Sequence, residues 1–184
     1  MSKSSWQELY ASAIVDGTAL ANSTVATSII NPEAKITLPP RFFQIGTMLR
    51  ITLSGRITTL NPTPGNLTLD ARIGAVVAMN GNTMALNTTA AKTNVAWMAE
   101  LIATCRAIGA GTNANLMFQW RFMSEAVALA ATGVGALFAP ASAPAVGTGF
   151  DSTVQNTLDV FGTFSVASAS NSIQVHQYAV EALN

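Results

Sequence analysis

Apolar and polar residues alternate at every second position in several short segments of this chain. Residues 48–58 are the clearest example, and such a period places the apolar side chains on one face of a β-strand. Gly55 falls on the same face, which predicts a bulge or a crowded neighbour there. The apolar set is Leu49, Ile51, Leu53 and Ile57.

The same alternation recurs at residues 67–73, 116–122 and 158–166. In the last segment Phe161 interrupts the polar face, which indicates cover on both sides. The second segment is rich in aromatic residues, and such side chains fit a pleated, half-buried surface. We therefore expect its apolar residues to lie in the core: Leu116, Phe118, Trp120 and Phe122.

Two turn signals predict hairpins. Residues 61–65 (Asn-Pro-Thr-Pro-Gly) separate the strands at 48–58 and 67–73, which predicts that these two strands pair. The dipeptide Asn80-Gly81 predicts a second hairpin between residues 76–79 and 83–86.

Residues 95–108 are ambiguous because Trp97, Leu101 and Cys105 recur every fourth position, which fits a helix or a strand. The alanine content favours a helix. The glycines that follow and the neighbouring strands favour a long strand with these three residues inward, and we predict the strand.

The last predicted strand spans residues 173–178. Its alternation predicts one face with Ile173, Val175 and Gln177. The other face would then carry Gln174, His176 and Tyr178.

Many short strands without a βαβ rhythm predict an all-β fold, an antiparallel two-sheet sandwich spanning residues 31–184. Residues 1–30 are an N-terminal arm or a first strand of the same sheet. Residues 124–149 form a long Ala/Gly/Pro-rich excursion with a short strand near 127–131. Both segments are more apolar than exposed segments usually are, and we expect them to carry assembly contacts.

The composition points to assembly. Only 10% of the 184 residues are charged, against about 25% in a typical soluble domain. A surface with so few charges either interacts with water through hydroxyl and amide groups or is covered by neighbouring subunits. The nine basic and nine acidic residues cancel and form no basic run, which argues against direct nucleic-acid binding. The apolar stretch 126–145 is too interrupted by glycine and proline to span a membrane.

No catalytic, cofactor-binding or metal-binding residues are predicted, and we expect no enzymatic activity. Cys105 lies in an apolar stretch and is predicted to be a buried thiol. His176 is the single histidine and is predicted to lie at the surface or in an interface. Asp151 and Asp159 carry no sign of an acid/base pair. Five arginines on predicted outer strand faces either solubilise a sheet or contact carboxylates across an interface: Arg50, Arg56, Arg72, Arg106 and Arg121.

Several segments, in a constant order over most of the chain, carry a family resemblance. The chain resembles the jelly-roll virion structural proteins of tailed bacteriophages, of the head decoration or minor capsid type. The resemblance implies a single jelly roll, a homotrimer and a place in the virion, assembled in the host bacterial cytoplasm. The segments are residues 17–22, 37–46 (Thr-Leu-Pro-Pro-Arg-Phe-Phe-Gln-Ile-Gly), 49–52, 64–70, 104–109 and 164–173.

Two functions follow as expectations. In the first, the protein oligomerises and docks on the major capsid protein lattice. In the alternative, it is a tail-fibre or baseplate receptor-binding module of the same fold that binds host surface saccharide. The alternative predicts exposed aromatic residues in loops, and we expect loops 61–65, 109–115 and 132–149 to present none, which counts against it. Trp6 is the one tryptophan expected to make an exposed contact.

Overall fold

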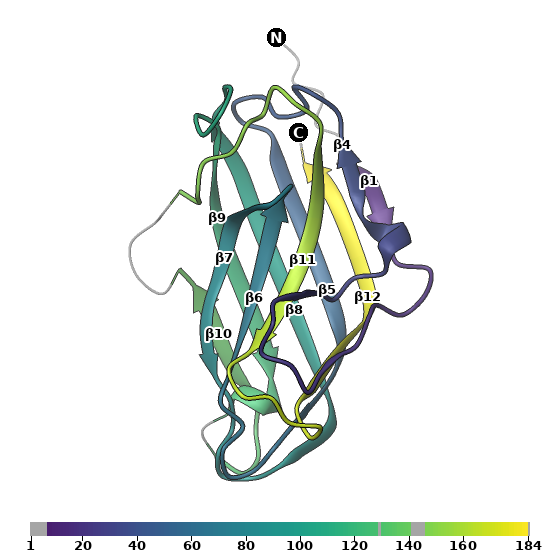
Figure 1. Ribbon diagram of the computed structural model, residues 1–184, viewed down its shortest axis with the longest axis vertical. Coiled ribbons are helices and arrows are strands. Elements are labelled where there is room, and N and C mark those ends of the chain that lie inside the picture. Colours follow the sequence, from purple (N-terminus) through teal and green to yellow (C-terminus); the bar gives the residue numbers. More distant parts are fainter. Residues whose placement is uncertain (1–6, 129, 141–145, 184) are drawn as a thin grey trace.

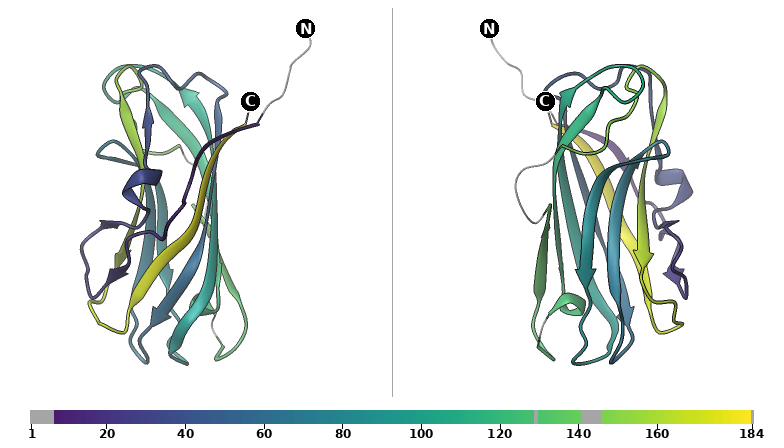
Figure 2. Two further views of the ribbon diagram at one scale, coloured as in Figure 1. Left: turned by 90° about the vertical axis from the view of Figure 1, so that its right-hand side faces the viewer. Right: turned by 60° about the vertical axis from the view of Figure 1, so that its left-hand side comes forward.

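The computed structural model describes residues 7–128, 130–140 and 146–183, and they form two antiparallel sheets packed face to face (Figure 1). The larger sheet has the strand order β1-β12-β5-β8-β9-β10, with β2 also pairing β12. The smaller sheet has the order β3-β11-β6-β7, with β4 also pairing β11. The side-on views of Figure 2 show the two layers. The predicted all-β sandwich is confirmed.

The elements have the following bounds. In the larger sheet they are β1 (Gln7–Ser12), β2 (Leu20–Ala21), β5 (Met48–Thr59), β8 (Lys92–Ala107), β9 (Asn115–Ser124), β10 (Gly135–Ala139) and β12 (Ser172–Leu183). In the smaller sheet they are β3 (Thr27–Ser28), β4 (Ile36–Leu38), β6 (Asn66–Ile73), β7 (Val76–Ala85) and β11 (Asn156–Phe164). Two short 3₁₀ turns complete the set, η1 (Pro32–Ala34) and η2 (Glu125–Val127).

The strand connectivity is that of a jelly roll. We count β1 and β2 together as the first strand and β3 and β4 together as the second. The larger sheet then has the order first-eighth-third-sixth, in which β12 is the eighth strand, β5 the third and β8 the sixth. The smaller sheet has the order second-seventh-fourth-fifth, in which β11 is the seventh strand, β6 the fourth and β7 the fifth. This arrangement is the double Greek key of an eight-stranded jelly roll. Strands β9 and β10 extend the larger sheet beyond β8.

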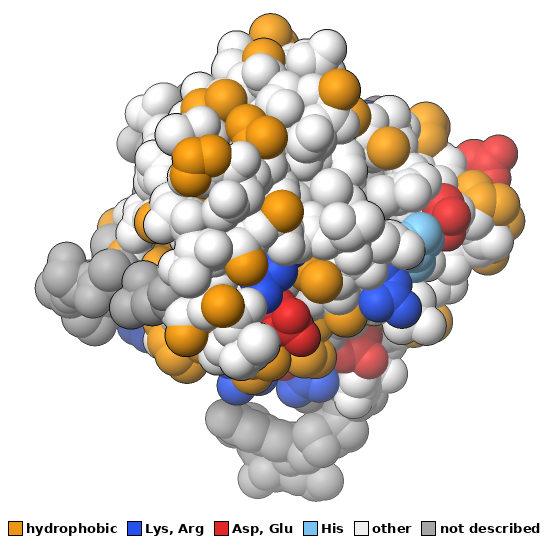
Figure 3. Space-filling model, turned by 90° about the horizontal axis from the view of Figure 1, so that it is seen from below, with side chains coloured by type: hydrophobic (Ala, Val, Ile, Leu, Met, Phe, Trp, Pro, Cys, Tyr) orange, Lys and Arg blue, Asp and Glu red, His pale blue; other side chains and the backbone are white. Residues whose placement is uncertain are grey.

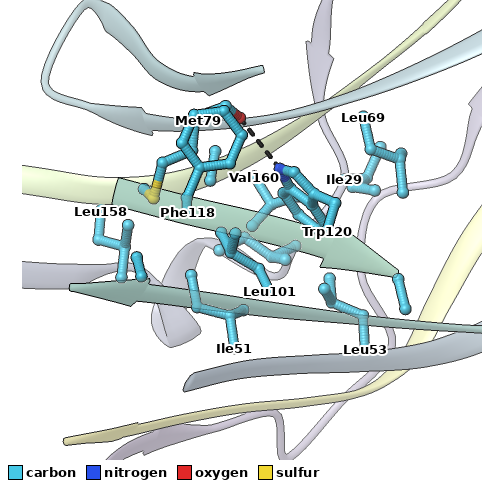
Figure 4. Close-up of a cluster of buried hydrophobic side chains, with 14 of the residues drawn as sticks. Ile29, Ile51, Leu53, Leu69, Met79, Leu101, Phe118, Trp120, Leu158 and Val160 are labelled. Carbon is cyan, nitrogen blue, oxygen red and sulfur yellow. Dashed lines mark hydrogen bonds between the residues drawn. The ribbon is translucent and has the colours of Figure 1, made fainter. Parts of the chain in front are cut away.

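The predicted aromatic strand lies in the core as expected. Residues 116, 118, 120 and 122 of β9 are all buried and point toward the smaller sheet. Figure 4 shows Trp120 of β9 among side chains from both sheets, including Leu101, Leu69 and Val160. The apolar positions of β5, β6 and β11 are also buried where the alternation predicted them, up to Phe164.

Residues 95–108 lie in a strand, as predicted. They belong to β8, and Trp97, Leu101 and Cys105 are all buried. The crowded neighbour expected at Gly55 is also present, because a Cβ on Gly55 would lie 1.9 Å from the carbonyl oxygen of Gln174. Trp97 is the partner of Gly55 on β8, and its indole donates a 3.2 Å hydrogen bond to the same oxygen.

The predicted hairpin between residues 48–58 and 67–73 is wrong. Strand β5 pairs with β12 and β8, whereas β6 pairs with β11 and β7 in the opposite sheet. The residues between β5 and β6 cross from one sheet to the other, and hydrogen bonds with the fully buried Asn171 fix their position. Its amide group accepts from the backbone N–H of Leu60 at 2.8 Å and donates to the carbonyl of Pro64 at 2.9 Å.

The predicted hairpin turn at Asn80-Gly81 is also wrong. Strand β7 runs through these residues, and the chain turns instead at residues 74–75, where Gly74 has a φ of +60°. The pairing register shifts between Thr68 and Asp70 of β6, so that Gly81 and Asn82 together oppose Leu69 in a bulge. Gly81 is required there because a Cβ would lie 2.2 Å from the carbonyl oxygen of Leu69.

The predicted faces of the last strand hold only for its first half. Ile173 and Val175 are buried, but the register shifts between Val175 and Gln177. After this bulge Tyr178 is buried and Gln177 is exposed, the reverse of the prediction. The extra residue, His176, moves every later side chain of β12 to the other face.

The first thirty residues contribute both a strand and core side chains. Residues 7–12 form β1, which pairs with β12 at the edge of the larger sheet. Leu20, Ile29 and Ile30 are buried in the core. Leu9 is exposed, Tyr10 packs edge-on against Phe42, and Trp6 lies outside the described residues.

The Ala/Gly/Pro-rich segment is partly folded onto the larger sheet. The strand expected near 127–131 is wrong, because the 3₁₀ turn η2 ends at Val127 and the chain pairs only later, as β10 against β9. Ala126 and Ala139 are buried, which fixes both ends of this stretch on the sandwich. Residues 129 and 141–145 of the predicted excursion lie outside the described residues.

Candidate functional site: the outer face of the larger sheet

Cys105 is a free, buried thiol, as the sequence predicted. Burial raises the pKa of this thiol, while a backbone hydrogen bond from Ala107 opposes the rise. A thiol is nucleophilic as its anion, so a raised pKa and burial both make Cys105 unreactive.

The other titratable residues considered from the sequence lie apart. His176 is partly exposed, and its Nδ1 lies 2.8 Å from Oδ1 of Asp16. Asp151 accepts from the backbone N–H of Gly111, and hydrogen bonds from this group and from Thr153 lower its pKa. Asp159 is buried and contacts other residues, so Asp151 and Asp159 form no acid/base pair.

Asp159 accepts from the backbone N–H of Val160 and has two side-chain partners from the first 35 residues of the chain. The hydroxyl of Ser28 donates to it at 2.7 Å, and Nζ of Lys35 lies 2.7 Å from its other oxygen. These contacts tie the N-terminal third of the chain to β11. Among the residues that the structure describes, no three His, Cys, Asp or Glu side chains are arranged to hold a metal ion. No helix in the described ranges is long and apolar enough to cross a membrane.

The predicted interface arginines divide into three kinds. Arg72 lies over the ring of Phe161, with its guanidinium carbon 3.9 Å from the ring centroid, and this covers the outer side of Phe161 as predicted. Arg56 and Arg106 are exposed. Arg50 and Arg121 belong to a charged row on the larger sheet, described below.

The larger sheet has an outer face whose side chains come from all of its long strands. Paired residues of an antiparallel sheet point to the same side, so the register defines rows across this face. One row contains Thr52, Glu100, Arg121 and Phe138, on β5, β8, β9 and β10. The next row contains Ser54, Met98, Met123 and Ala136 on the same strands.

A groove of about 400 Å³ lies on this face. Met98 and Met123 line it, and they are 57% and 37% exposed, large values for methionine side chains. Methionine is flexible and polarizable, and it is common at surfaces that bind a partner. The polar groups in the lining include Ser54 and Gln177, which are hydrogen-bonded to each other at 3.1 Å.

Four charged residues form a stepped charge row across the face beside the groove: Glu181 is the register partner of Arg50, and Glu100 is the partner of Arg121 two residues further along the strands. Glu181, Arg50, Glu100 and Arg121 lie on the consecutive strands β12, β5, β8 and β9, and their charges alternate. Arg50 Nη1 lies 3.4 Å from Glu181 and Arg50 Nε lies 3.6 Å from Glu100. Arg121 pairs with the other oxygen of Glu100. The row is therefore neutral overall, and its ion pairs lie within the chain, while the buried Arg50 Nε has no hydrogen-bond partner among the described residues.

Sequence reasoning did not find this row or the exposed Phe138. The arginines were assigned to outer strand faces, but the glutamates and the order of the strands were not part of the prediction. Phe138, on β10, is 52% exposed and lies beside its register partner Arg121 on β9. Residues 135–139 (Gly-Ala-Leu-Phe-Ala) show no alternation of apolar and polar residues, so the sequence carries no signal that Phe138 points outward.

Comparisons with known proteins add little. No family model matches the chain, and no curated protein sequence does. Arcelin-5, a lectin-like defense protein from Phaseolus vulgaris, has a TM-score of 0.34 and 9% identity, covering 97% of each chain. A seed lectin from Lotus tetragonolobus has a TM-score of 0.35 and 6% identity, over 100% of this chain and 95% of the other.

A third similar structure is the CBM2 module of the evolved Dit of Lactobacillus casei BL23 phage J-1. It has a TM-score of 0.29 and 9% identity, and the match covers 82% of this chain and 68% of that chain. These likenesses are confined to the general all-β sandwich form.

Proposed function

We propose that this protein is a non-enzymatic structural protein of a bacteriophage virion, a capsid decoration or minor capsid protein. It self-associates, with a homotrimer as the expected unit, and docks on the lattice of the major capsid protein. The ordered set of segments that resembles jelly-roll virion proteins supports the assignment. The jelly-roll connectivity agrees with that resemblance but is shared by proteins of many functions.

The observation that carries the proposal is the outer face of the larger sheet. Exposed methionines, a groove and an internally neutralised charge row occupy this face, on a chain that is only 10% charged. The end of the sandwich drawn in Figure 3 likewise shows few charged side chains among many apolar and uncharged polar ones. Large apolar groups gathered on one face mark an interaction surface. A protein built to bind other proteins has this surface.

Labelling of phage particles tests the virion location. Antibodies against the recombinant protein are expected to decorate the heads of purified particles of the phage that encodes it, seen by electron microscopy. Addition of the recombinant protein to particles that lack it should restore the label. Antibody on tails alone would refute the capsid assignment, and particles without any label would refute the virion location.

One observation favours the second candidate, a tail-fibre or baseplate module that binds host saccharide. The half-exposed ring of Phe138 lies beside Arg121 and Glu100, and an aromatic ring next to charged hydrogen-bonding groups can stack on a sugar. In that case Phe138→Ala should abolish binding to purified host surface polysaccharide while leaving the melting temperature unchanged. Binding that Phe138→Ala does not weaken would place any saccharide site elsewhere.

A further inference from the structure

Arg41 occupies a backbone position that usually belongs to glycine. Residues 39–42 form a turn, which the backbone N–H of Phe42 closes by donating to the carbonyl of Pro39 at 3.1 Å. Arg41 is the third residue of this turn and has a φ of +62°. Pro40 at the second position and a positive φ at the third are features of a type II turn, in which the third residue is normally glycine or asparagine. Arginine there costs conformational energy, and residues held in such strain cluster at binding and active sites.

The backbone of Arg41 is held in place, but its side chain is unpaired. Its N–H donates to the carbonyl of Ser152 at 2.8 Å. The residue is exposed, and its guanidinium has no ion-pair or hydrogen-bond partner among the described residues. Asp151 lies next to Ser152, but hydrogen bonds from Gly111 and Thr153 occupy both of its carboxylate oxygens. The five N–H donors of the guanidinium are therefore open to a group from outside the chain.

A pocket of about 430 Å³ lies beside Arg41, at the end of the sandwich drawn at the top of Figure 1. The loops that precede β5, β9 and β11 meet there. The N–H of Ser152 donates to the carbonyl of Gly109 at 3.0 Å, and the hydroxyl of Ser152 accepts from the N–H of Gly109 at 2.9 Å. These bonds fix two of the three loops against each other. The lining consists of Arg41, Phe43, Gln44, Ile108, Ser152 and Thr153.

Exposed apolar side chains accompany the pocket. Ile45, Ile108 and Val154 are 69%, 48% and 48% exposed, and each belongs to the lining or adjoins a lining residue in the sequence. Large apolar groups gathered around a pocket mark a protein interaction surface. A partner that covers this surface also removes water from Arg41, and a covered guanidinium needs a carboxylate to pair with it. The partner must therefore carry an acidic side chain among apolar ones.

We propose that this end of the sandwich docks on a partner protein through an acidic side chain that enters the pocket and pairs with Arg41. Apolar side chains of the partner then pack against Ile45, Ile108 and Val154. The inference rests on the proposed function, in which the partner is the lattice of the major capsid protein. That function requires one surface for further copies of this chain and another for the lattice, and this end supplies the surface for the lattice.

Substitution of Arg41 by glycine separates folding from docking. Arg41→Gly removes the guanidinium and suits the left-handed turn, so the variant should melt at or above the temperature of the wild type. Its affinity for phage particles that lack the protein should fall at least about tenfold, because the partner's carboxylate loses its cation. Sedimentation of the labelled protein with the particles measures this. Arg41→Lys keeps the charge without the planar fork and should bind with intermediate affinity. Ile108→Ser should also weaken binding.

The matched control is Arg56→Gln, which removes one exposed positive charge from β5, outside the pocket, and should bind particles as the wild type does. An Arg41→Gly protein that binds as tightly as the wild type would overturn the acidic contact and leave capsid docking standing. Wild-type protein that does not bind the particles would overturn capsid docking and this inference together. Loss of oligomer mass in light scattering for Arg41→Gly would assign the pocket to a contact between copies of this chain, which also overturns the inference.

Discussion

The indole Nε1 of Trp120 donates a hydrogen bond to the backbone carbonyl oxygen of Met79 at 3.1 Å, and this bond joins the two sheets through the core (Figure 4). Trp120 lies on β9 and Met79 on β7, and both are buried. The bond satisfies the one polar atom of a large apolar side chain and also a carbonyl two residues before the bulge at Gly81-Asn82. The aromatic strand and the bulge therefore depend on each other.

Truncation of Trp120 is expected to be strongly destabilising. Trp120→Ala should lower the free energy of unfolding by about 3–5 kcal/mol, because it leaves a cavity and an unpaired carbonyl. Trp120→Phe retains most of the volume and should cost less. Urea denaturation followed by circular dichroism measures both. Equal losses in the two variants would show that the hydrogen bond, and not the packing, carries the effect.

Gly55→Ala is expected to destabilise the sandwich by at least about 2 kcal/mol, because its Cβ would lie 1.9 Å from the Gln174 carbonyl oxygen. The neighbouring β12 must then move, and the hydrogen bond from Trp97 to the same oxygen moves with it. Ser54→Ala, one residue away on the outer face, is the control and should have a small effect. Thermal unfolding of the two variants compares them directly. A Gly55→Ala protein that melts with the wild type would contradict this packing.

The thiol of Cys105 should react slowly with a disulfide reagent in the folded protein. Burial hides it and raises its pKa, so the native reaction should be at least about a hundredfold slower than in urea. Ser170→Cys introduces a thiol at an exposed position and is the control, since one equivalent should then react at once. The colour released by the reagent measures both rates. A rapid reaction of native wild-type protein would show that β8 opens readily.

Asp70 should make the protein less stable as the pH rises. Burial raises its pKa in the folded state above the ordinary value of 3.8, although the nearby Arg72 opposes this. The folded state therefore holds the proton more tightly than the unfolded state. The favourable contribution of the protonated group is complete below the unfolded-state pKa and is lost as the pH rises through the folded-state pKa.

Asp70→Asn removes this titration. The variant should gain stability relative to the wild type between pH 3 and pH 7, as measured by urea unfolding at both values. Glu33→Gln, an exposed site, should show no such trend. A relative gain for Asp70→Asn toward acid pH would mean that the pair with Arg72 outweighs burial.

The local pattern of the sequence determined which residues form strands and which side chains enter the core. Leu49 to Ile57 and Leu116 to Phe122 are buried where a period of two places them, because alternation is a property of each strand alone. The same reasoning identified Trp97, Leu101 and Cys105 as the inner face of one long strand. The low charge of the chain predicts assembly, and this stays a prediction.

Only the tertiary structure decided which strands pair and where the register shifts. The turn residues at 61–65 and the pair Asn80-Gly81 fit a hairpin locally. The first segment instead crosses between sheets, and the second lies inside β7, where Gly81 begins a bulge against Leu69. The bulge at His176 reversed the face of half a strand. The charge row depends on long-range pairing, because its residues come from β12, from β5 and from the β8–β9 hairpin, which lie far apart in the sequence. Their order across the sheet follows from long-range pairing, which no local pattern contains.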